Sequence, residues 1–176
     1  MSGGRRLLIG IGNELRGDDA AGLLVARAAL DRELEPEPPC LFSPKGRKKA
    51  GGSAGSGAVE VIELEGEPVE LIAAWEGVEA VVVADCAAPA GQPGRLHRFE
   101  LGDEPLPAAL GGPSTHALGL VEAVELARSL DRLPKRLVVL AVEGERFELG
   151  GEPTEVVRET AASAAAAALE DLTGGW

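Results

Sequence analysis

Short apolar segments rich in β-branched residues alternate along this chain with longer segments whose apolar residues recur at helical spacing. Residues 80–85 read AVVVAD, which is typical of a strand buried on both faces, whereas residues 115–130 show the helical period. The predicted strands are residues 5–11, 58–64, 80–85, 94–101 and 135–143, and the predicted helices are residues 18–34, 67–77, 115–130 and 153–172. This alternation predicts an α/β fold in three layers: a mainly parallel twisted sheet of about five strands, with helices on both faces.

One segment, residues 36–57, breaks the alternation. It runs through prolines, then basic residues, then glycines and serines, and it has no period. We expect a flexible insertion here, because such a composition cannot bury an apolar face. A chain of 176 residues is long enough for one full-sized core, so we predict a single domain over residues 1–176.

Composition narrows the classes of partner and compartment. The formal net charge of −12 argues against nucleic acid, whose phosphates are bound by clustered lysines and arginines. No apolar run approaches the ~20 residues that span a bilayer. The N-terminal segment shows no signal-peptide pattern. Two cysteines without a CxxC pair favour a reducing cytoplasm.

Three polar residues are predicted at the carboxyl edge of the sheet, where open α/β sheets bind their ligands. Glu14 follows the first strand, Asp85 ends the strand 80–85, and His116 begins a helix that leads into a parallel strand. Each also has an ordinary structural interpretation: an exposed turn, a cap of the next turn, or a first helical turn. Two carboxylates and an imidazole suit a borderline divalent ion such as Zn²⁺ or Ni²⁺.

The glycine-rich segment 7–26 resembles a nucleotide-binding loop only superficially. Gly10, Gly12 and Gly17 do not have the G-x-G-x-x-G spacing. Asp18 and Asp19 stand at the start of the predicted helix, where acids are common caps and would repel a phosphate. A dinucleotide site is therefore disfavoured.

Two further residues invite a chemical interpretation that is outweighed by a structural one. Cys86 with His116 as its base can be drawn as a thiol protease pair, but a small buried cysteine after a core strand is the stronger interpretation. His97 shares a strand face with Phe99 and Leu101, which predicts packing and not ligation.

Four segments resemble motifs of the hydrogenase maturation proteases. They are GIGNELRGDDAAG, VVVADCAAPAGQPG, STHALGLVEAVELA and AVEGERFELGGEPTEVV, and they occur in the order expected for the family. The chain departs from the family pattern by the insertion 36–57, by Ala21 in place of a glycine, and by Cys86 in place of a smaller residue. The tripeptide Val142–Gly144 resembles a shifted or degraded form of the family's C-terminal motif, so no residue role is transferred from it.

The resemblance implies an aspartic-type endopeptidase that removes the C-terminal extension of the nickel–iron hydrogenase large subunit precursor after nickel insertion. It assigns catalysis and metal contact to Glu14, Asp85 and His116. Nickel would be carried by the substrate, and zinc or cadmium could occupy the same site. We expect no nucleotide cofactor and no membrane partner, and the glycines of the first motif would let the substrate tail approach closely.

Two alternatives to that assignment remain. One is a non-catalytic metal-binding or metallochaperone domain on the same scaffold. The other is a metal-independent protease of the same fold, such as those of spore germination, which would not need His116.

Overall fold

The computed structural model describes residues 4–34, 58–102, 106 and 115–174. For residues 115–118, the first turn of a helix, it describes the backbone only. The segment 36–57 lies outside the described residues, so the flexible insertion and the single-domain boundaries stay predictions. Within the described residues, no helix is long and apolar enough to cross a membrane.

A five-stranded sheet forms the middle layer. Its strands are β1 (Arg6–Ile11), β2 (Val59–Leu64), β3 (Ala80–Ala87), β4 (Leu96–Glu100) and β5 (Arg136–Glu143). They lie in the order β2-β1-β3-β5-β4, and β4 alone is antiparallel to its neighbour. The predicted mainly parallel sheet of about five strands is confirmed.

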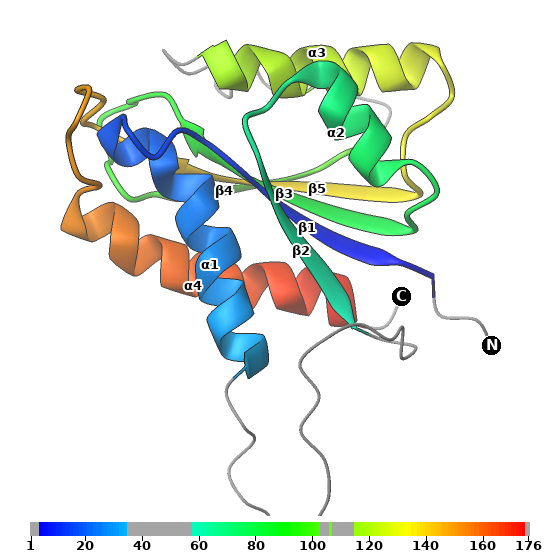
Figure 1. Ribbon diagram of the computed structural model, residues 1–176, viewed down its shortest axis with the longest axis horizontal. Coiled ribbons are helices and arrows are strands. Elements are labelled where there is room, and N and C mark those ends of the chain that lie inside the picture. The colour runs from blue at the N-terminus through cyan, green and yellow to red at the C-terminus, as the bar shows by residue number, and fades with distance from the viewer. Residues whose placement is uncertain (1–3, 35–57, 103–105, 107–114, 175–176) are drawn as a thin grey trace, which may run out of the picture.

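Helices cover both faces of this sheet (Figure 1). They are the 3-10 turn η1 (Gly17–Ala20), α1 (Ala21–Leu34), α2 (Pro68–Trp75), α3 (Thr115–Ser129) and α4 (Glu155–Thr173). On one face Leu7, Ile9 and Val83 pack with α2 and α3, and on the other Leu8, Val82 and Leu140 pack with α1 and α4. Alternate residues of each strand thus pack into the two cores on opposite sides of the sheet, and β3 and β5 are apolar on both faces for this reason.

The strand order defines where a ligand site should form. β1 and β3 are neighbours, yet the chain leaves β1 through α1 on one face and enters β3 from α2 on the other. Such a reversal opens a crevice outside the carboxyl ends of the two strands. In this chain the topology therefore points to the loop after β1 and the end of β3 as the place for a ligand site.

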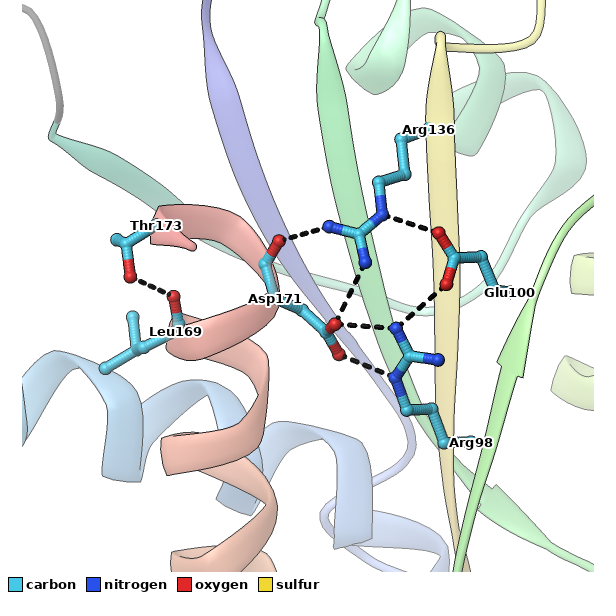
Figure 2. Close-up of polar contacts among 6 residues, drawn as sticks. All are labelled: Arg98, Glu100, Arg136, Leu169, Asp171 and Thr173. Carbon is cyan, nitrogen blue, oxygen red and sulfur yellow. Dashed lines mark hydrogen bonds and ion pairs between the residues drawn. The ribbon is translucent and has the colours of Figure 1, made fainter. Parts of the chain in front are cut away.

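A four-residue ionic network fastens the edge strand β4 to the last helix (Figure 2). Asp171 of α4 accepts hydrogen bonds from Arg98 at 2.6 Å and from Arg136 at 3.1 Å, and Arg136 also donates to Glu100 at 2.7 Å. The two guanidinium groups hold the pKa of Glu100 below its usual value. This network surrounds Arg136, where β5 begins, so it stabilises the sheet at the end away from the crevice.

Candidate active site at the carboxyl ends of β1 and β3

Asp85 is the buried carboxyl group at this edge of the sheet. It lies within β3, two residues before the strand's last residue, and only 2% of its surface is exposed. Its Oδ1 accepts the backbone N–H of Cys86 at 2.7 Å. Burial raises the pKa of Asp85 to about 8; the Cys86 amide opposes this rise, and the negative charge of Asp19 adds to it.

Asp19 is the acidic neighbour that the structure places beside Asp85. It lies in η1 and is 1% exposed, and its charge acts on Asp85. A helix start is where the sequence predicts Asp19; the structure places it in the first turn of η1, and α1 begins only at Ala21. The signal that was missed is an acid pair directly after a glycine-rich loop that follows a core strand.

Asp18 has a different task from its neighbour. Its carboxylate is fully buried and accepts the N–H groups of Glu145 and Arg146 at 2.9 and 3.0 Å through Oδ2. Through Oδ1 it accepts the N–H and the hydroxyl of Thr154 at 2.7 and 3.0 Å. Four donors from a loop far along the chain therefore fix η1, and with it Asp19, at the edge of the sheet.

The glycines of the first motif make room for the chain itself, and their predicted role toward a substrate tail stays a prediction. A Cβ on Gly12 would lie 2.2 Å from the carbonyl oxygen of Asp19. A Cβ on Gly22 would lie 2.2 Å from the carbonyl oxygen of Ala84 and 2.3 Å from that of Ile11. Glycine is required at both positions because the turn that carries Asp19 packs directly on the ends of β1 and β3.

Glu14 lies in an exposed turn, which is one of the two interpretations that the sequence allows. Its side chain is 60% exposed and forms an ion pair with Arg27 of α1, with 2.5 Å between Oε1 and Nη1. The acidic charge that acts on Asp85 is that of Asp19. The role of Glu14 as a ligand stays a prediction, and the described contacts favour Asp19 for the place beside Asp85.

His116 is the second residue of α3, as predicted. The start of α3 packs on the turn after β2, because a Cβ on Gly119 would lie 2.0 Å from the carbonyl oxygen of Gly66. That contact places the first turn of α3 at the carboxyl edge of the sheet. Among the side chains that the structure describes, no three ligating groups are close enough to hold a metal ion, but the imidazole of His116 is outside that set. The predicted triad is therefore untested.

Cys86 does not have the properties of a nucleophile. The thiol is buried, and burial raises its pKa, as do the negative charges of Asp85, Asp19 and Asp18. A thiolate is the reactive form, so this environment opposes the thiol protease interpretation.

Glu143 is a buried acid that the sequence analysis left unassigned. It ends β5 and accepts the N–H groups of Ala90 and Gln92 at 2.6 and 2.7 Å, which anchors the loop after β3. Burial alone would raise the pKa of Glu143, but these two amides and His97 hold it below the usual value. The signal for this residue was an acid after an apolar strand, the same signal that singled out Asp85.

His97 packs as predicted. Its ring stacks on Phe99 with centroids 6.2 Å apart and planes at 5°. Its Nε2 lies 3.6 Å from Oε2 of Glu143. The role of His97 is thus to cover a buried carboxylate.

Comparison with known proteins gives one consistent result. A model of the hydrogenase maturation protease family matches residues 48–171. The hydrogenase 2 maturation protease of Escherichia coli (strain K12) is 28% identical over 172 residues, which cover 95% of this chain and 92% of that protein. The structure of the hydrogenase maturating endopeptidase HybD from E. coli superposes with a TM-score of 0.68 at 25% identity, covering 94% of this chain and 92% of that one.

A further solved structure shares the fold at lower identity. The NiFe hydrogenase maturation protease HybD from Thermococcus kodakarensis has a TM-score of 0.66 and 22% identity, and the match covers 96% of this chain and 99% of that one. The fold and the relatives define an endopeptidase with a three-layer α/β architecture. Because the family model matches well over half of the sequence, the chain belongs to the hydrogenase maturation protease family. The alternative of a non-catalytic metal-binding domain gains no support from these relatives.

Proposed function

We propose that this protein removes the C-terminal extension of a nickel-loaded hydrogenase large subunit precursor, in the cytoplasm, and that Asp19, Asp85 and His116 form its working site. Membership of the family supports the reaction. The observation that supports the site is the pair of buried, interacting carboxyl groups, Asp19 and Asp85, near the carboxyl ends of β1 and β3.

The two carboxyl groups fit a divalent cation. Two buried acids side by side are costly to ionise, and that cost is why the pKa of Asp85 is raised. A doubly charged ion offsets it, and carboxylate oxygens together with the His116 imidazole are a donor set that nickel accepts. We take the nickel to be part of the substrate, so this site serves to recognise a loaded precursor.

Peptide hydrolysis also needs a group that accepts a proton from water. We assign this task to Asp85. Its pKa of about 8 keeps the carboxyl group mostly protonated at neutral pH when no cation is near, and the charge of the substrate's nickel favours the ionised form that can accept a proton. Its Oδ1 is engaged by the Cys86 amide, so we assign Oδ2 to the water. The water oxygen bonds to the peptide carbon, its proton passes to Asp85 and then to the leaving nitrogen, and the C–N bond breaks.

The test compares cleavage of a nickel-loaded precursor with cleavage of a nickel-free one. Nickel-loaded and nickel-free precursors are incubated with the enzyme, and the products are weighed by mass spectrometry. We expect a shortened product only from the loaded precursor. Cleavage of both precursors would refute nickel recognition, and cleavage of neither would refute the proposed reaction.

Four variants separate the roles. Asp85→Asn should lose cleavage, because an amide is no base, and His116→Ala should weaken binding of the loaded precursor, because it removes a nickel ligand. Asp19→Asn should lose activity, and Glu14→Gln should keep most of it. If Glu14→Gln is inactive while Asp19→Asn is active, the assignment made from the sequence is the right one.

A further inference from the structure

A cavity of about 530 Å³ lies beside the site, at the carboxyl ends of β1 and β2. Its lining is strongly acidic, with side chains from both strand ends, from α1 and from α2. The acidic lining residues are Glu14, Glu63, Glu65, Glu67 and Glu70, and Arg27 is the one basic residue in the lining. An acidic cavity of this kind attracts cations.

Arg27 is held in the cavity by two of these glutamates. It donates from Nε and Nη2 to the two carboxylate oxygens of Glu63, at 2.8 and 2.9 Å. Its remaining terminal nitrogen, Nη1, pairs with Oε1 of Glu14. The contact with Glu63 is bidentate, which is the strong form of an arginine–carboxylate pair. The same guanidinium also pairs with Glu14.

The charge of Arg27 is permanent. The hydrogen bonds from Glu63 and then Glu14 raise the pKa of Arg27 beyond its already high value. A free metal ion that enters the cavity must therefore compete for oxygens of Glu14 and Glu63 and is also repelled by a fixed positive charge.

We propose that Arg27 is a specificity-determining residue, which occupies the carboxylates of Glu14 and Glu63 and so prevents this cavity from capturing free divalent cations. This inference rests on the proposed function, in which the enzyme must respond to nickel held by its substrate. If free nickel bound in this cavity, a second positive ion would lie beside the site. Its charge would repel the nickel of the loaded precursor and so weaken docking.

The direct test is a calorimetric titration of chelator-stripped protein with Ni²⁺. Arg27→Gln should bind Ni²⁺ about tenfold more tightly than the wild type, or gain a binding step that the wild type lacks. Arg27→Lys keeps the positive charge and should stay within about twofold of the wild type. Thermal melting of each variant establishes that the fold is retained.

Two controls locate the effect. Arg32→Gln removes the same charge from the same helix, where Arg32 donates to the carbonyl oxygen of Ala162, and should leave Ni²⁺ binding unchanged. Adding Glu14→Gln to Arg27→Gln should abolish the gain. The proposal is overturned if Arg27→Gln binds Ni²⁺ no better than the wild type, or if Arg32→Gln produces the same gain.

A second readout links the cavity to catalysis. Free Ni²⁺ should inhibit processing by Arg27→Gln at concentrations about tenfold lower than for the wild type, in line with the gain in affinity. Equal inhibition of both enzymes would contradict the inference. The titration needs no precursor, so it tests the role of Arg27 independently of cleavage. A wild-type enzyme that cannot cleave the precursor would refute the proposed function and leave the inference about Arg27 standing.

Discussion

The Asp18 contacts allow a worked prediction for the variant Asp18→Asn. The wild-type carboxylate is fully buried and accepts four hydrogen bonds, three of them from backbone N–H groups. An asparagine has nearly the same shape but only one accepting oxygen, and its amide group would face N–H donors in either orientation. The substitution therefore replaces an acceptor by a donor inside a closed pocket.

The cost follows from these bonds. If the new oxygen faces Glu145 and Arg146, the amide group meets Thr154, whose hydroxyl can rotate to accept but whose N–H cannot. One buried N–H is stranded, which costs about 1–3 kcal/mol, and the bonds that remain lose the strengthening of a charged acceptor. We expect the free energy of unfolding to fall by about 3 kcal/mol, a large part of the ~5–15 kcal/mol typical of a domain.

Urea denaturation measures this loss, and hydrogen exchange locates it. The amides of Glu145, Arg146 and Thr154 should exchange faster in the variant than in the wild type. Asp31→Asn makes the same chemical change on an exposed residue of α1 and should alter stability by less than about 0.5 kcal/mol. A loss no larger than that of Asp31→Asn, with the three amides still protected, would refute the anchoring role of Asp18.

Three further predictions concern other parts of the chain. Burial raises the folded-state pKa of Asp85 to about 8, so the contribution of this group to stability is lost as pH rises from about 4 to 8. With chelator present, the free energy of unfolding of Asp85→Asn should rise relative to that of the wild type by about 1.4 kcal/mol per pH unit from pH 5 to 7. A difference between the two proteins that stays constant with pH in urea denaturation would contradict this. Gly22→Ala should lower stability by about 3 kcal/mol in urea denaturation, since its Cβ would meet the carbonyl oxygen of Ala84 at 2.2 Å; a neutral substitution would show that the turn can move. Deletion of residues 44–57 should scarcely change the melting temperature if the segment is a loop, and a large drop would show that it is packed structure.

The fold was largely predictable because its signals are local. The nine predicted elements all occur, and most of their ends agree within two residues. The main difference concerns the predicted helix 18–34, which in the structure begins only at Ala21. The turn η1 precedes it, and η1 starts at Gly17, which adopts a positive φ of 57°. Apolar periodicity does not distinguish a helix from a 3-10 turn that continues into it, so the pattern predicts a helix start three residues too early.

The site was only partly predictable. Asp85 is identifiable because a charged residue rarely follows five apolar ones in a core strand, and His116 because a helix start can be located. Glu14 and Asp19 were not distinguishable, since both follow the first strand and both are acidic. The choice between them depends on tertiary contacts. Glu14 pairs with Arg27 on the next helix, whereas the charge of Asp19 acts on Asp85, which is far along the chain.

The sequence by itself determined the alternation of strands and helices, the two apolar faces of the sheet and the edge at which polar residues gather. Only the tertiary structure decided what each acid at that edge does. Asp18 and Asp19 are adjacent and chemically identical, yet one is surrounded by amide donors and the other lies beside a second buried carboxyl group. The physical reason is that the energy of a carboxylate depends on the dipoles and charges around it, and folding brings these from distant parts of the chain.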